Sequence, residues 1–145
     1  MKRRKRSGAA AVEFAAVSPL FLLILLGSID MGQMVNVHQK ACNAAREGAR
    51  VAARAQSTVS DVENAVETYL ADVLPALDID SDSSPLTIVV KNSSGTVLSD
   101  SLSSALTGTE ISVEVAIHYN SVRAIQGLSL LNDRSIVTKT VMRRE

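Results

Sequence analysis

The feature that most constrains this chain is a long apolar run near its beginning that carries a single charge. The run extends from Ala9 to Ile29, 21 residues of which only Glu13 is charged. As a helix it would span about 31 Å, enough to cross a hydrocarbon core of about 30 Å. It is longer than the apolar region of a cleavable secretory signal, and it leads into Asp30 without an obvious cleavage motif. We therefore expect a retained membrane helix over residues 9–29.

The charges around this run predict its orientation. Five basic residues precede Gly8, and such a cluster holds the N-terminus in the cytoplasm. The rest of the chain would then lie outside the plasma (inner) membrane, as a single-pass protein. The chain has a formal net charge of zero, so without those five residues the remainder would carry −5. An acidic remainder with only 3% aromatic residues argues against nucleic-acid binding.

A carboxylate within a membrane segment is costly, so Glu13 requires a partner. Glu13 follows Gly8 by five positions, which is the spacing of a type IV prepilin processing site. The alternative is that Glu13 only reaches the nearby cytoplasmic headgroups. Pro19 lies in the same segment and cannot donate its backbone bond to the carbonyl of Ala15, so we expect a local bend there.

The helical pattern continues beyond the apolar run. Between Lys40 and Ala53, small residues recur at helical spacing on one side, and polar residues recur on the other. This smooth side can pack against the chain's own domain, or it can form a seam for neighbouring helices, where small residues allow close approach. The candidate helix-packing stripe comprises Ala41, Ala45, Gly48, Ala49 and Ala52.

Four blocks of this region form a distinctive series: Gly8-Ala-Ala-Ala-Val-Glu-Phe14, Pro19-Leu-Phe-Leu-Leu23, Gly27-Ser-Ile-Asp-Met-Gly32 and Asn43-Ala-Ala-Arg-Glu-Gly-Ala-Arg50. The series resembles the TadE-like proteins, the pseudopilins of the tight-adherence (Flp-type) pilus assembly system. The resemblance extends from Gly8 to Ala53, about a third of the chain, with a weaker one at the tail, residues 137–145. Gln33 departs from it, since relatives often have an arginine there.

The resemblance implies that a prepilin peptidase cuts between Gly8 and Ala9, with Glu13 and Phe14 belonging to the processing and assembly motif. Glu13 would then be the fifth residue of the mature chain. In such assemblies the glutamate is expected to pair with the N-terminal amine of a neighbouring subunit. The implied partners are the peptidase, other pilins or pseudopilins, pilus-assembly membrane proteins and membrane lipid.

The remaining sequence predicts a small α+β domain. Ser60 and Glu63 have capping-box spacing and open a second helix, which Pro75 closes. Leu86–Lys91 and a turn at Asn92–Gly95 predict a hairpin to residues 96–98. Two further strands are predicted, one by alternation over residues 111–119 and one over residues 134–143. A long helix on a small antiparallel sheet is the general layout of pilin-like subunits.

The predicted organisation therefore has four parts: a basic leader at 1–8, a membrane helix at 9–29, its continuation at 30–56, and an extracytoplasmic domain at 57–145. Residues 121–131 fit a short helix or a loop. Asp78, Asp80 and Asp82 alternate, but lack the glycine and closing acid of a calcium loop.

No catalytic constellation is visible in the sequence. Cys42 lies four residues after His38, but a metal or a catalytic thiol would need further ligands or an orienting group. We expect no enzyme activity, no metal and no cofactor. Two functions remain: a minor pilin or pseudopilin that assembles through its N-terminal helix, and an uncleaved single-pass anchor for an extracytoplasmic binding domain. An exported hydrolase would need a catalytic cluster that the pattern lacks.

Overall fold

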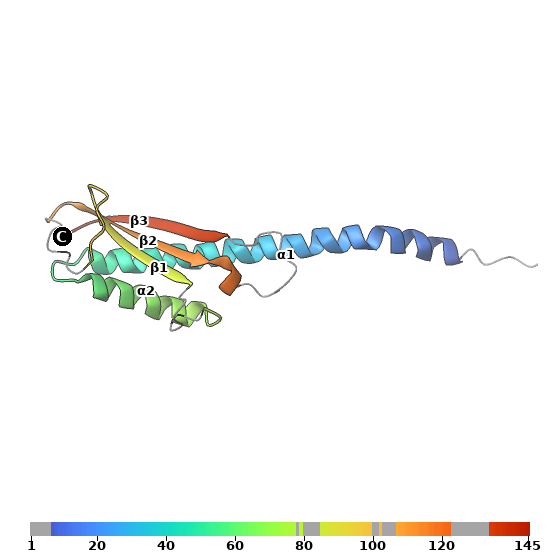
Figure 1. Cartoon of the computed structure of the whole chain (residues 1–145), viewed down its shortest axis with the longest axis horizontal. Coiled ribbons are helices and arrows are strands. Elements are labelled where there is room, and N and C mark those ends of the chain that lie inside the picture. Colours follow the sequence, from blue (N-terminus) through green and yellow to red (C-terminus); the bar gives the residue numbers. More distant parts are fainter. Residues whose placement is uncertain (1–6, 78, 80–84, 100–101, 103–106, 123–133) are drawn as a thin grey trace, which may run out of the picture.

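The computed structural model describes residues 7–77, 79, 85–99, 102, 107–122 and 134–145. Figure 1 shows an elongated molecule in which the first helix forms the long axis and the other elements gather around its C-terminal half. In chain order the elements are α1 (Ser7–Ala52), α2 (Val59–Val73), β1 (Leu86–Asn92), β2 (Glu110–His118), the 3-10 turn η2 (Tyr119–Ser121) and β3 (Ser135–Arg143).

Helix α1 is one continuous helix of 46 residues that joins the predicted membrane segment to its extramembrane continuation. Alanine, leucine and other good helix formers dominate it, so local propensity favours the helix along its length. It ends at Ala52, earlier than the predicted boundary at residue 56. There the amide of Arg54 donates to the carbonyl of Val51 (3.1 Å), and the amide of Ser57 donates to the carbonyl of Arg54 (3.4 Å). These short-range bonds turn the chain toward α2.

The second helix forms as predicted, but its capping box lies two residues earlier than Ser60 and Glu63. The hydroxyl of Thr58 accepts a bond from the amide of Asp61 (3.2 Å), and the Asp61 carboxylate accepts one from the amide of Thr58 (2.8 Å). Both residue pairs satisfy the spacing rule. The earlier start also brings Val59 into the core, where it is buried. The bonds from the backbone and side chain of Thr58 lower the pKa of Asp61.

The three strands form one antiparallel sheet in the order β1-β2-β3. The register aligns Leu86 of β1, Ile117 of β2 and Ile136 of β3 in one row, and all three are buried. The alternation predicted for residues 111–119 is confirmed, except that Tyr119 begins η2 and does not end the strand. Ser112, predicted to be outside, is also buried. Inward-facing Ile136 and half-buried Met142 agree with the strand predicted over 134–143.

The predicted turn after β1 forms, although the returning segment is not a strand. The side-chain oxygen of Asn92 accepts bonds from the amides of Ser94 (3.0 Å) and Thr96 (2.9 Å). Gly95 takes a positive φ of 82°, a conformation that glycine adopts without steric cost. The chain then returns as a single bridge between Lys91 and Val97.

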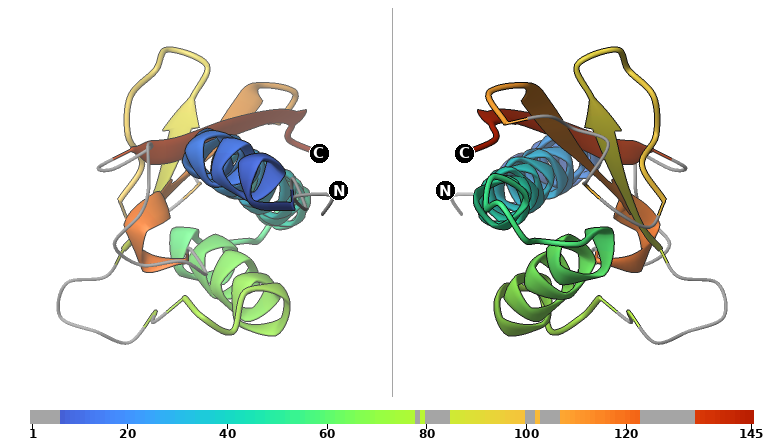
Figure 2. Two further views of the ribbon diagram at one scale, coloured as in Figure 1. Left: turned by 90° about the vertical axis from the view of Figure 1, so that its right-hand side faces the viewer. Right: turned by 90° about the vertical axis from the view of Figure 1, so that its left-hand side faces the viewer.

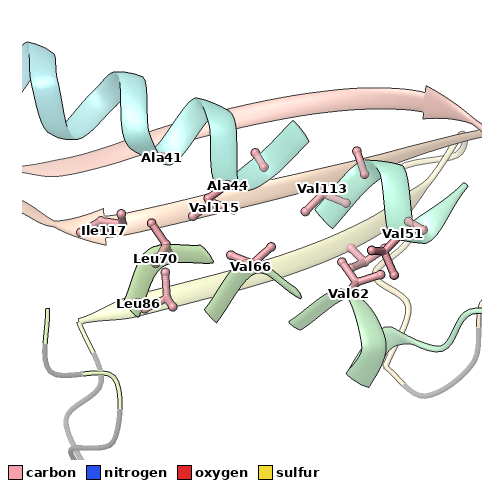
Figure 3. Close-up of a cluster of buried hydrophobic side chains, with 14 of the residues drawn as sticks. Ala41, Ala44, Val51, Val62, Val66, Leu70, Leu86, Val113, Val115 and Ile117 are labelled. Atoms are coloured by element: carbon pink, nitrogen blue, oxygen red, sulfur yellow. The ribbon is translucent and has the colours of Figure 1, made fainter. Parts of the chain in front are cut away.

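The core lies where the C-terminal half of α1 is enclosed between the sheet and α2, as the end-on views in Figure 2 show. Figure 3 shows the contacting side chains: Ala41 and Ala44 from α1 lie near valines and isoleucine of β2, with the apolar face of α2 closing the other side. The buried residues of α2 are Val59, Val62, Val66 and Leu70. Small residues on α1 therefore meet branched residues on its neighbours.

Two predicted segments lie largely outside the described residues. The aspartate-rich stretch includes Asp78, Asp80 and Asp82, none of which the structure describes. The predicted helix or loop at 121–131 begins with the end of η2, and residues 123–133 also lie outside the description. The possible calcium loop and the conformation of that connection stay predictions.

Gly48 is the tightest point of this packing. A Cβ added there would lie 2.6 Å from Val66 Cγ2 and 3.3 Å from Val62 Cγ1, both on α2. We predict that Gly48→Ala destabilises the domain by about 1–3 kcal/mol, because α2 must move away. The matched control is Gly32→Ala in the same helix, where the added methyl meets nothing within 4 Å. Urea unfolding of the full chain in detergent micelles measures both changes, and equal stability of the two variants would contradict the prediction.

Candidate functional site on the N-terminal helix

The N-terminal half of α1 leaves most of its apolar side chains uncovered by the described part of the chain. Leu26 is half-buried, and the large apolar side chains that are exposed range from 42% (Ile29) to 72% (Phe14). An 18-residue window of this helix has a mean hydropathy of 2.3, and none of it is buried. Such exposure in water would be strongly unfavourable, because burying apolar area is the main force that stabilises folded chains. This helix is long and apolar enough to cross a membrane, which is consistent with membrane anchoring.

The predicted processing residues lie together at the exposed start of this helix. The helix begins at Ser7, and Gly8, Ala9, Glu13 and Phe14 are all exposed. A Cβ at Gly8 would meet nothing within 4 Å. Packing among the described residues therefore does not require glycine at this position. The Glu13 carboxylate forms no ion pair with any described residue.

Pro19 is tolerated because a neighbouring hydroxyl replaces the missing donor. Proline cannot donate to the carbonyl of Ala15, four residues earlier. The hydroxyl of Ser18 donates to that same carbonyl at 3.2 Å. Such side-chain substitution is how membrane helices accommodate proline. The sequence predicted the missing bond but not the replacement.

At the end of the apolar run, the folded domain holds the helix through a buried tyrosine. Tyr119 is fully buried, and its hydroxyl lies 2.7 Å from the Asp30 carboxylate and 2.9 Å from the Asp30 carbonyl. Asp30 is the first charged residue after the apolar run, so this contact lies where the exposed segment ends and the domain begins. Sequence reasoning placed Tyr119 in the core but missed its partner, which lies 89 positions away.

The small-residue stripe packs within its own domain. Ala41, Ala45, Ala49 and Ala52 are at most 1% exposed, and Gly48 is buried too. In this structure the stripe faces α2 and the sheet, so it packs on its own domain and leaves no seam there for a neighbouring helix. The polar side faces water, where Arg50 forms an ion pair with Glu47. The hydrogen bond from Arg50 lowers the pKa of Glu47.

Two further contacts, which the sequence did not predict, tie the domain to α1 and to the turn that follows it. The ammonium of Lys40 donates to the carbonyl of Val73 at the C-terminal end of α2 (2.8 Å), where a cation is favoured by the helix dipole. At the other end, buried Arg144 donates to the carbonyls of Ala55 (2.8 Å) and Leu102. Lys40 lies on a polar helix face and Arg144 in a charged tail, where such side chains are usually exposed to solvent. No sequence signal therefore distinguished these two residues from ordinary surface charges.

The His38–Cys42 pair forms as the helical spacing predicts, with 3.7 Å between the sulfur and Nε2. The contact is on the surface. Among the described residues, no group of three or more histidine, cysteine or acidic side chains could hold a metal ion. His118 lies on the exposed face of the sheet, beside Ser135 Oγ at 3.5 Å from its Nδ1. The two histidines therefore lie in separate surface contacts.

The fold and this site define a class of protein. The N-terminal half of its long helix is apolar and could anchor it in a membrane, and the C-terminal half of the same helix packs against a small α+β domain. The family model of TadE-like proteins matches residues 8–50. The N-terminal region of the chain is thus similar to the TadE-like proteins. No curated protein and no solved structure matches the chain.

We predict that Tyr119→Phe loosens the domain from α1 near Asp30. Removing the hydroxyl should cost about 1.5–3 kcal/mol, as for a hydrogen bond to a charged group. Tyr69→Phe is the matched control, because the Tyr69 hydroxyl forms no hydrogen bond with the described residues. Amide hydrogen exchange of α1 near Asp30 and thermal unfolding measure the effect. If both variants behaved like the parent chain, the contact would not stabilise the junction.

Proposed function

We propose that this protein is a minor pilin or pseudopilin of a Flp-type (tight-adherence) pilus, processed between Gly8 and Ala9 by a prepilin peptidase. The observation that carries the proposal is the glycine and glutamate spaced by five positions at the start of α1, whose N-terminal half is apolar and largely exposed. Glycine there serves no packing among the described residues. Glycine would be needed at this position if a protease must approach the backbone closely, because glycine has no Cβ to obstruct it.

Processing would also create the partner that Glu13 lacks. The cut frees an α-amine, which titrates near pH 8 and is largely protonated at neutral pH. Within one chain it would lie about 6 Å along the helix axis from Glu13. In the membrane, leaving either charge unpaired is expensive. Pairing between the glutamate of one subunit and the amine of the next would therefore favour side-by-side assembly of the helices.

The proposal also implies an orientation of the chain in the membrane and a role without catalysis. The basic leader would stay in the cytoplasm and the α+β domain would lie outside the membrane. The chain would act as a substrate and structural component, without cofactor or metal.

N-terminal sequencing of the membrane-extracted protein tests the proposal, and a mature chain beginning at Ala9 is expected. We predict that Gly8→Arg blocks the cut, so that the protein migrates as the longer precursor. Gln33→Arg is the control, since it adds the same charge beyond the apolar run and should leave processing normal. An intact leader on the native protein would instead favour an uncleaved, membrane-anchored binding domain.

A second experiment separates processing from assembly. We predict that Glu13→Ala is still cut at Ala9 but supports no pili, because the amine of the neighbouring subunit loses its counter-charge. Glu13→Gln, which keeps the size and removes the charge, should fail in the same way. Electron microscopy of surface pili gives the readout, with N-terminal sequencing as the control for cleavage. Normal piliation in both variants would remove the assembly role of the charge.

A further inference from the structure

Strand β3 lies at one edge of the sheet, with β2 on one side and no described strand on the other. Along β3, the backbone N–H and C=O groups of successive residues point alternately toward β2 and toward the opposite side. Just outside its ends, the carbonyl of Arg134 accepts from the amide of Tyr119 (3.0 Å), and the amide of Arg144 donates to Thr109 (2.9 Å). Even-numbered residues of β3 therefore pair with β2. The backbone groups of Ser135, Val137, Lys139, Val141 and Arg143 point to the open edge.

The opposite edge of the sheet is partly closed by the chain itself, over the last residues of β1. There the backbone of β1 pairs with the segment after the turn. The amide of Leu98 donates to the carbonyl of Val90 (2.8 Å), and the amide of Asn92 donates to the carbonyl of Thr96 (3.0 Å). A bridge between Lys91 and Val97 lies between these bonds. The two edges of one small sheet thus differ: the described chain pairs with the end of β1 but not with the outer side of β3.

Strand β3 also lacks most features by which proteins protect an open edge. It has nine residues without proline or glycine, and its register with β2 is unbroken from Ser135 to Arg143. Val137 and Val141 are exposed by 59% and 48%. Beyond Val35, the only other large apolar side chain this exposed among the described residues is Val97. Two of the three exposed valines of the domain thus lie on this strand.

We propose that β3 is a docking edge to which an extended segment of another protein adds as a fourth strand. Only an extended backbone can satisfy donors and acceptors at strand spacing, and added strands gain specificity from alternate side chains. The segment that fits has apolar residues facing Val137 and Val141. The added segment also has an acidic residue facing Lys139. The Lys139 side chain is half-exposed, and its Nζ lies 3.8 Å from Oε1 of Glu114.

A second copy of this chain is a poorer occupant. Strand β3 begins next to the Tyr119–Asp30 contact and ends beside the C-terminal end of α1, where the amide of Glu145 donates to the carbonyl of Ala53 (2.9 Å). It therefore runs along α1 away from the apolar half (Figure 1). Antiparallel pairing of two β3 edges would point the two apolar helices in opposite directions. It would also place Lys139 against Lys139 of the other copy.

A designed peptide tests the edge directly on the full chain in detergent micelles. The probe has the sequence of β3 with glutamate in place of its central lysine, so that antiparallel addition sets valine against Val137 and Val141. In the free protein, the amides of Val137, Lys139 and Val141 should exchange fast and those of the even-numbered residues slowly. The peptide should slow exchange of the odd-numbered amides by about ten-fold or more. An unchanged exchange pattern would overturn the proposal.

Two variants make the test specific. Val137→Pro removes an amide that points outward and should abolish the protection, while the bonds to β2 persist. Val137→Thr keeps that amide and a β-branched side chain, and should bind like the parent. If Val137→Pro disturbs the fold, Val141→Lys blocks the edge by charge alone. The assignment would be overturned if the peptide protected the amides of Val141→Lys as strongly as those of the parent. It would also be overturned if the native protein were a dimer that Val137→Pro or Val141→Lys dissociates.

In cells, the same variants connect the edge to assembly, and this step rests on the proposed function. Val137→Pro and Val141→Lys should be processed and reach the membrane normally but support fewer pili than Val137→Thr. Normal piliation with both blocking variants would show that the edge has no partner in assembly. The peptide experiment does not depend on leader removal, so a failure at Gly8 and a failure at β3 are distinguishable.

Discussion

The structure depends on the close packing of the small face of α1 between α2 and the sheet. Alanine and glycine project almost nothing from the helix, so the branched side chains of α2 and β2 reach its backbone. Because this face is confined to the C-terminal half of α1, the domain assembles there. The apolar half is left uncovered by the described residues, which is consistent with membrane anchoring.

Two carboxylates on the same helix illustrate the consequence. Asp30 lies where the domain begins, and buried Tyr119 hydrogen-bonds to it. Glu13 lies within the apolar half, where its carboxylate forms no ion pair with a described residue. One carboxylate is used to build the subunit. The other is available for a contact between subunits, which is why we place the assembly role at Glu13.

The domain has a comparable asymmetry. The chain's own turn pairs with the end of β1, whereas no described strand pairs with the outer side of β3. An assembling subunit needs surfaces that its own fold leaves incomplete. The apolar half of α1 and the outer edge of β3 are two such surfaces. In the proposed pilin, the first would meet other helices within the membrane and the second would take an extended segment outside it.

The sequence alone determined the periodic and local features. The apolar run, the Gly8–Glu13 spacing, the second helix and the alternating strand of residues 111–117 are readable because each reflects a repeat or spacing within a few residues. Local rules did not decide between alternatives of equal spacing. Both Ser60 and Thr58 fit a capping box, and the burial of Val59 accompanies the choice of Thr58.

Only the tertiary structure decided which surfaces are buried within the folded chain and which stay exposed. The stripe at Ala41 and Gly48 could pack on its own domain or on a neighbour, and the folded chain buries it internally. The Tyr119–Asp30 bond, the buried Arg144 and the open edge of β3 join or separate residues far apart in sequence. They depend on how the elements meet in space, which no local pattern records.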